Sequence, residues 1–122
     1  MKSIEENNQV RLRHMLDAAH RVIAFCQGES RESLEKDEKL QYALVKAIEI
    51  IGEAATQITP EFQVTTPQIP WPAIKGMRNR LIHAYFDIDL DILWNTATEA
   101  IPPLISELEK LISSEDASED EK

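Results

Sequence analysis

The chain is poor in three residue types, and each scarcity excludes a class of protein. Its 122 residues include one cysteine, three glycines and 6% aromatic side chains. Because Cys26 stands alone, neither an internal disulfide nor a cysteine-based zinc site can form. The scarcity of glycine argues against a β-sandwich, whose many tight turns require it.

Long apolar runs are also missing. The longest uninterrupted apolar run, Val22 to Cys26, is far shorter than the ~20 residues of a membrane span. No apolar stretch follows Lys2, so we expect no signal peptide. These absences predict a cytoplasmic protein that does not enter a membrane.

Acidic side chains outnumber basic ones by 22 to 13, for a formal charge of −9, and 43% of the residues are hydrophobic. This length and composition suit a single folded core. The acidity alone disfavours nucleic acid as a partner. Five acids and one lysine lie within residues 113–122. We therefore predict one domain at residues 1–113 and a disordered acidic tail at residues 114–122.

Apolar residues that recur at alternating steps of four and three predict four helices. The first begins at a capping box that starts with Ser3 and ends near Gly28. The second begins near Ser30 or Ser33 and runs to about residue 59, where Pro60 stops it. The other two are expected at about residues 73–84 and 89–113.

Prolines and small residues divide this pattern. Residues 60–72 hold four of the six prolines and predict a connecting loop. Pro102–Pro103 should bend or split the fourth helix. Gly52, followed by Ala54–Ala55, offers a patch where another helix can approach closely. With no alternation long enough for a strand, the prediction is an all-α, up-down bundle of four to five helices, with a Pro-rich loop before the short third helix.

The segment from Lys75 to Phe86 is the strongest candidate for chemistry. It holds three cations and no acid in an acidic chain. On a continuous helix Asn79 and His83 share a face, Arg80 lies near them, and the long side chain of Arg78 can reach back. Imidazole moves protons near neutral pH, and guanidinium binds phosphate with paired donors. These groups can converge on one anionic group.

No serine or thiol lies beside His83 to act as a nucleophile, so a substrate that carries its own nucleophile fits better. RNA does, because its 2′-hydroxyl can attack the adjacent phosphate. Such cleavage needs an acid and a base, and under this hypothesis a symmetric dimer would supply two histidines. The ordinary interpretation stays open: a basic helix end in which Arg80 balances a nearby acid, while Tyr85 and Phe86 are core residues.

The pattern Arg78-Asn-x-x-x-His83-x-Tyr85 resembles the Arg-x(4)-His-x-Tyr signature of the HepT-like toxins in the HEPN superfamily. Flanking segments are similar to that family as well, and the resemblance covers about residues 5–112. These segments are Ile51-Gly52-Glu53-Ala54-Ala55, Pro70-Trp71, Gly76-Met77-Arg78-Asn79 and Asp87-Ile88-Asp89 leading to Trp94.

The resemblance implies a homodimeric, metal-independent endoribonuclease, the toxin of a type VII (MntA/HepT) toxin–antitoxin system. Arg78 and His83 would be catalytic, with Asn79 in support. An MntA-type nucleotidyltransferase antitoxin would attach AMP to Tyr85. The substrate would be tRNA or mRNA rather than DNA, and no cofactor is expected. The alternative is a non-catalytic HEPN module that binds a nucleotidyltransferase or a nucleotide.

Three further features are weaker. His14, Asp17 and His20 have metal-ligand spacing, but the two histidines diverge by about 120° on a helix. A solvated face is the simpler interpretation, and nearby arginines at 11, 13 and 21 offer an extension of an RNA-binding surface.

The acids at 87, 89 and 91 begin like a calcium loop, but Ile92 stands at the position that requires glycine. They suit the start of the fourth helix instead. Glu53 is either simply exposed or, in a supporting role, a partner for Arg78 or Arg80.

Overall fold

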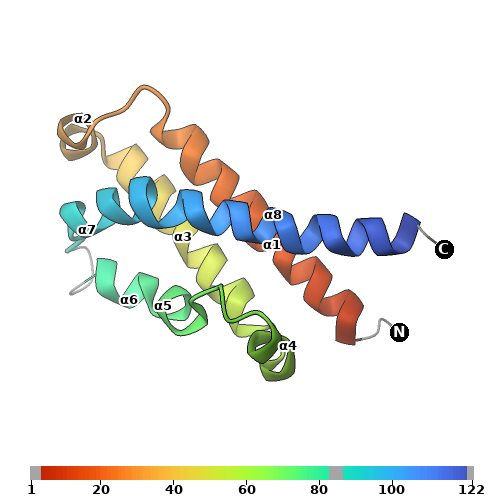
Figure 1. The fold of residues 1–122 in the computed structure, drawn as a ribbon. Helices are drawn as coiled ribbons and strands as arrows, with labels where there is room; N and C mark the ends of the chain where they lie inside the picture. The colour runs from red at the N-terminus through yellow and green to blue at the C-terminus, as the bar shows by residue number, and fades with distance from the viewer. Residues whose placement is uncertain (1–3, 83–86, 121–122) are drawn as a thin grey trace.

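The computed structural model describes the backbone of residues 4–82 and 87–120 and the side chains of residues 7–82 and 87–112. Within this part the fold is all-α, as predicted (Figure 1). Its elements are α1 (Ile4–Cys26), α2 (Arg31–Lys36), α3 (Glu38–Thr56), α4 (Pro60–Thr65), α5 (Trp71–Lys75), α6 (Met77–Leu81), α7 (Leu90–Asn95), the π-helix η1 (Thr96–Ala100) and α8 (Ile101–Asp120).

Three long helices enclose the core. α1 packs against both α3 and α8, and the short helices α5 and α6 pack against another flank of α3. Figure 1 shows α8 crossing α1 and α3, with both chain ends on the same side of the bundle. The predicted apolar stripe of α3 is buried, with Leu44 and Ile51 fully inaccessible to solvent.

The predicted second helix is in fact two helices, α2 and α3. They are separated by Asp37, whose backbone is extended (φ −123°, ψ 94°). Its carboxylate accepts a hydrogen bond from the backbone N–H of Leu40 at 3.1 Å and so caps α3. The start near Ser30 is confirmed, because Ser30 and Ser33 form a reciprocal capping box on α2.

The Pro-rich segment is more ordered than a simple connecting loop. The preceding helix, α3, already ends at Thr56, earlier than predicted, and Pro60 instead begins α4, which Thr59 caps. The buried Asn8 of α1 holds this cap: its amide donates to Thr59 Oγ1 and its carbonyl oxygen accepts from Thr59 N, both at 3.1 Å. At the far end of the segment, Trp71 Nε1 donates to Thr66 Oγ1.

The predicted third helix is divided and shorter than expected. Gly76 separates α5 from α6, and α6 ends at Leu81. Ile82 has an extended backbone (φ −119°, ψ 115°) and forms an antiparallel bridge with Ile88. The prediction of helix at residue 82 is therefore wrong; its last two residues, 83 and 84, lie outside the described residues.

The predicted fourth helix is interrupted near its proline pair. Pro102 and Pro103 have no N–H to donate to carbonyls four residues earlier, and the turn before them widens into η1. There the backbone N–H of Ile101 bonds to Thr96 O, five residues back. The bounds of α8 include residues 114–120, and the division into a domain and an acidic tail stays a prediction.

Candidate active site

Arg78 is held over α3 by an ion pair. Its Nε donates to Glu49 Oε2 at 2.7 Å, joining α6 to α3. Lys46, one turn earlier on α3, approaches the other oxygen of Glu49 at 3.3 Å. The hydrogen bond from Arg78 holds the pKa of Glu49 below its ordinary value, with a smaller contribution from Lys46, while partial burial acts in the opposite direction. Glu49 is therefore an anion at neutral pH.

The ion pair leaves much of the guanidinium available. The Arg78 side chain is 51% exposed, whereas that of Glu49 is 22% exposed. Within the described side chains, Arg78 bonds only through Nε, and no acceptor occupies its terminal nitrogens. These two nitrogens are a fork that can bind the oxygens of a phosphate. The arrangement therefore combines an oriented cation with open donors.

Gly52 sets how closely the α5–α6 segment approaches α3. A Cβ atom on Gly52 would lie 3.3 Å from the carbonyl oxygen of Ile74, tighter than ordinary van der Waals contact. The prediction that another helix packs closely on this small-residue patch is confirmed. Because α6 follows α5 directly through Gly76, this contact also helps to place Arg78.

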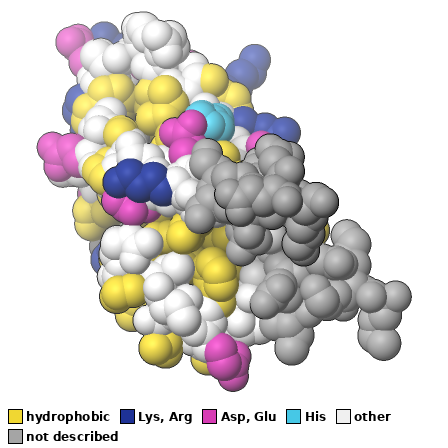
Figure 2. All heavy atoms as spheres, turned by 45° about the vertical axis from the view of Figure 1, so that its right-hand side comes forward, with side chains coloured by type: hydrophobic (Ala, Val, Ile, Leu, Met, Phe, Trp, Pro, Cys, Tyr) yellow, Lys and Arg dark blue, Asp and Glu magenta, His cyan; other side chains and the backbone are white. Residues whose placement is uncertain are grey.

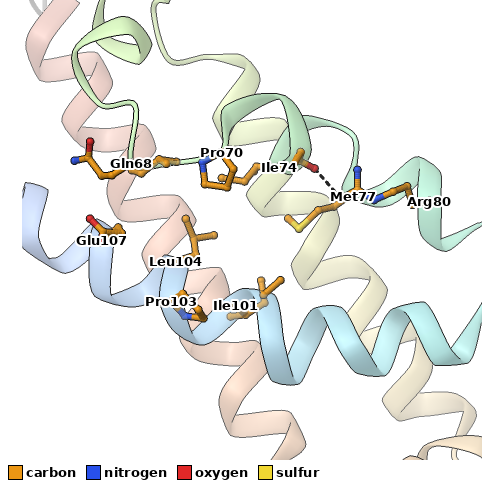
Figure 3. Close-up of a pocket in the computed structure, with 12 residues that line it drawn as sticks. Gln68, Pro70, Ile74, Met77, Arg80, Ile101, Pro103, Leu104 and Glu107 are labelled. Carbon is orange, nitrogen blue, oxygen red and sulfur yellow. Dashed lines mark hydrogen bonds between the residues drawn. The ribbon is translucent and has the colours of Figure 1, made fainter.

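Arg80 does not join Arg78. Its Nη2 donates to the backbone carbonyl of Ala73 at 2.9 Å, so the guanidinium folds back onto α5. This side chain lines an apolar cavity of about 140 Å³ between the α5–α6 segment and α8. Figure 3 shows Arg80 and Met77 on one side of that cavity, with Leu104 of α8 opposite. The bond that Arg80 makes is to backbone, and its supporting role stays a prediction.

Asn79 is exposed on α6 beside Arg78. His83 and Tyr85 lie outside the described residues. The described residues on either side are in contact: Ile82 forms an antiparallel bridge with Ile88, and Asp89 N donates a hydrogen bond to Leu81 O at 2.7 Å. The roles assigned to His83 and Tyr85 stay predictions.

Within the described side chains, Glu53 forms no ion pair with Arg78 or Arg80. It is exposed and lines a groove of about 370 Å³ with Arg11 and His14 of α1. Within the described side chains, the carboxylate that pairs with Arg78 is Glu49, one helical turn before Glu53. The sequence analysis missed Glu49, although its spacing from Lys46 indicated an exposed charged edge on the second predicted helix.

Neither the acids at 87, 89 and 91 nor the spaced residues His14, Asp17 and His20 form a metal site in the described structure. Asp89 caps α7 by accepting a hydrogen bond from Ile92 N at 3.0 Å, and Asp91 pairs with Arg31 at 2.8 Å. His14, Asp17 and His20 are exposed. Across the described residues, no three His, Cys, Asp or Glu side chains are grouped as a metal site would require.

The surface charge is mixed in sign. Figure 2 shows acidic and basic side chains interspersed with hydrophobic ones on the face nearest the chain ends. With a net charge of −9, basic side chains therefore still lie on this face among acidic ones. In the described part of the chain, no helix is apolar over enough residues to cross a membrane.

Comparison with known proteins identifies the family. The model of the family described as "Ribonuclease HepT-like" matches residues 15–111. The "Probable ribonuclease HepT" of Thermococcus cleftensis is 48% identical over 75 residues, which are 62% of this chain and 68% of that protein. A "Putative RNase" of Caldanaerobacter subterraneus is 36% identical over 104 residues, 85% of this chain and 93% of that protein.

A "Putative RNase" of Methanocaldococcus jannaschii is 37% identical over 95 residues, 78% of this chain and 87% of that protein. No solved structure matches the chain significantly. The family match spans the α3–α6 segment that carries Glu49 and Arg78 as well as the interrupted last helix. By the extent of these matches, the chain belongs to the ribonuclease HepT-like family.

Proposed function

We propose that the chain is a metal-independent endoribonuclease that acts as the toxin of a type VII toxin–antitoxin pair. The observation that supports this most directly is Arg78, which Glu49 holds through Nε while the side chain stays 51% exposed and, within the described side chains, no acceptor occupies its terminal nitrogens. Membership of the ribonuclease HepT-like family and relatives named as ribonucleases support the same substrate class. The site offers a phosphate-binding group, and the sequence from Lys75 to Phe86 contains neither serine nor cysteine.

The reaction is transfer of a phosphate ester within RNA. The 2′-hydroxyl oxygen attacks the adjacent phosphorus, and His83 of one protomer removes its proton. The bond from phosphorus to O5′ breaks, and His83 of the second protomer gives a proton to that oxygen. The products are a 2′,3′-cyclic phosphate and a 5′-hydroxyl. Arg78 binds the non-bridging oxygens and stabilises the charge that develops on them.

The resemblance to HepT-like toxins also implies regulation through Tyr85. Attachment of AMP to its hydroxyl by an MntA-type nucleotidyltransferase would place phosphate charge two residues from His83. That charge would compete with RNA for Arg78 and repel the RNA backbone.

The test is RNA cleavage by the purified protein in the presence of a chelator. We expect cleavage that leaves 2′,3′-cyclic phosphate ends and is abolished by His83→Ala without a change in the helical circular dichroism spectrum. Arg78→Lys should also reduce turnover, because an ammonium cannot replace the paired fork. His20→Ala is the matched control. Full activity of His83→Ala would refute the mechanism.

The regulatory part has its own measurement. The intact mass of the protein is compared after expression with and without a neighbouring nucleotidyltransferase gene. A gain of one or more AMP masses that disappears in Tyr85→Phe, together with loss of cleavage, would support the toxin–antitoxin assignment. Unmodified protein that cleaves RNA in both samples would leave a ribonuclease under another control. Unmodified protein without cleavage would instead favour a binding module.

A further inference from the structure

We propose that the exposed strip of α3 between α6 and α1 is a track for one strand of RNA. In this arrangement Arg11 and His14 bind the nucleotide next to the one held at Arg78. The inference rests on the proposed ribonuclease function and identifies the surface that the substrate occupies beyond the scissile phosphate.

One bank of the strip is formed by α5 and α6. Gly52 of α3 faces α5, since a Cβ there would lie 3.3 Å from Ile74 O. Glu49 lies roughly 60° further round the α3 axis and pairs with Arg78 of α6. Arg78 therefore lies at the edge of the strip, with its side chain 51% exposed.

The other bank is formed by α1. Going round the α3 axis away from Gly52, Glu53 lies roughly 40° beyond Glu49. Ile50 lies further round, roughly 100° beyond Glu49. Both residues line the 370 Å³ groove together with Arg11 and His14 of α1. Because Glu53 is also only about 6 Å from Glu49 along the axis, the groove opens close enough to Arg78 for adjoining nucleotides of one strand.

The lining of the groove matches the chemistry of a nucleotide. Its volume lies within the range of roughly 300–1,000 Å³ that is usual for small-molecule sites. On the α1 side, Arg11 and His14 offer N–H donors to a phosphate. On the α3 side, the Glu53 carboxylate accepts hydrogen bonds, as an exocyclic amino group or a ribose hydroxyl requires. Ile50 supplies an apolar surface for the sugar or base.

Charge along the strip also favours RNA. Arg11, Lys46 and Arg78 contribute three cations, against two carboxylates from Glu49 and Glu53. The strip is thus locally positive in a chain of net charge −9. Salt screens charges more than about 8–10 Å away, so an RNA strand in the strip interacts mainly with these nearby groups.

The test is equilibrium binding of a fluorescent, 2′-O-methylated oligoribonucleotide, which the proposed mechanism cannot cleave. Arg11→Gln should weaken binding about tenfold, as loss of one charge-assisted hydrogen bond does. It should also reduce the slope of log K against log salt by about 0.7, the value for one phosphate contact on a single strand. His14→Gln should weaken binding as well.

Two control variants remove a histidine and a cation elsewhere. His20→Gln changes an exposed histidine about 120° round α1 from His14, and Lys110→Gln removes an exposed cation of α8. Both should bind the oligonucleotide as the unmodified protein does. Equal losses in Arg11→Gln and Lys110→Gln, or unchanged binding and slope in Arg11→Gln, would overturn the track.

A variant that adds a positive charge is expected to strengthen binding, a result that loss of folding cannot produce. Gln57 is an exposed residue of the groove at the C-terminal end of α3, where a cation is also favourable to the helix. Gln57→Lys should tighten binding and steepen the salt slope by about 0.7. Binding that is unchanged or weaker in this variant would contradict the proposal.

The two proposals fail in different ways. If the protein binds the oligonucleotide through Arg11 but does not cleave unmodified RNA, the track stands and the ribonuclease mechanism is refuted. If it cleaves RNA and Arg11→Gln has an unchanged dissociation constant, the mechanism stands and the track is refuted. Absence of oligonucleotide binding by the unmodified protein refutes the track directly.

Discussion

Glu49 should orient Arg78 for catalysis, and Glu49→Gln tests this role. Glutamine keeps the size and shape of the side chain but replaces a charge-assisted hydrogen bond with a neutral one, which is roughly half as strong. The 2.7 Å bond from Arg78 Nε is the contact that fixes the guanidinium against α3. The substitution should therefore loosen the terminal nitrogens that bind the scissile phosphate.

Opposing effects on the kinetic constants follow from the structure. A misplacement of about 1 Å can cost roughly a hundredfold in rate, so we expect kcat to fall by about ten- to a hundredfold. Loss of the carboxylate charge, roughly 6 Å from the bound phosphate, removes a repulsion of about 0.7 kcal/mol in water. KM should therefore stay constant or fall about threefold. Because the Arg78 side chain is 51% exposed, the change in unfolding free energy should be below about 1 kcal/mol.

The assay is steady-state cleavage of a fluorescence-quenched oligoribonucleotide. Glu107→Gln serves as the matched control, because Glu107 of α8 is 29% exposed and pairs with Lys110 at 3.4 Å. Its kinetic constants should not change. If Glu49→Gln instead kept or increased kcat while lowering KM, Glu49 would only compete with RNA for Arg78, and its positioning role would be refuted.

The pH dependence of this ion pair has a definite sign. Because the folded protein holds the pKa of Glu49 below its ordinary value of about 4.5, the pair contributes its full stability above that pH. The contribution is lost as the pH falls through the depressed pKa. From about pH 5 upward Glu49 stays ionised, so Glu49→Gln should lower the pH–rate profile without moving its limbs there.

Three further predictions concern packing, thiol chemistry and the acidic tail. Gly52→Val should lower the unfolding free energy by about 1–3 kcal/mol in a denaturant titration and reduce RNA cleavage, because its branches would push against the Ile74 carbonyl; unchanged stability would mean that α5 is not fixed there. Burial, and then the charge of Glu29, raise the pKa of Cys26 above its ordinary value, so iodoacetamide should alkylate it more slowly in the folded protein than in urea. Deleting residues 114–122 should increase affinity for the 2′-O-methylated oligonucleotide, and no change or a loss would show that this segment does not compete with RNA.

Hydrophobic periodicity predicted the helices well, because the side of a helix that is buried against the core is the side that carries its apolar residues. The residues at the four–three spacing on α3, such as Leu44 and Ile51, are the ones that the structure buries. Hydrophobic periodicity cannot locate a short interruption of a helix, because one residue with an extended backbone leaves the spacing of the apolar residues in the sequence unchanged. Asp37 divides the second predicted helix for a local reason, capping of the next helix, that the hydrophobic pattern does not record.

Sequence reasoning found the cation of the site but not its partner. Arg78 stood out because it belongs to a basic segment of an acidic chain. Glu49 is one of many acids on predicted exposed positions, and it is 29 residues from Arg78 in the chain. Its selection depends on the packing of α6 against α3, which the close approach at Gly52 makes possible. Contact between two helices, rather than spacing within one helix, therefore determines that Glu49 and not Glu53 pairs with Arg78.

The end of α6 changes how the spacing between Arg78 and His83 should be interpreted. On a continuous helix this interval would be fixed at 1.5 Å and 100° per residue. The helix ends at Leu81 and Ile82 is extended, so the Ile82–Ile88 bridge and the bond from Asp89 N to Leu81 O take over as the local constraints. Asp89 in turn caps α7. The described residues before and after positions 83–86 are therefore joined by contacts between the end of α6 and the start of α7, and the helical repeat of α6 cannot be extended from Arg78 past Leu81.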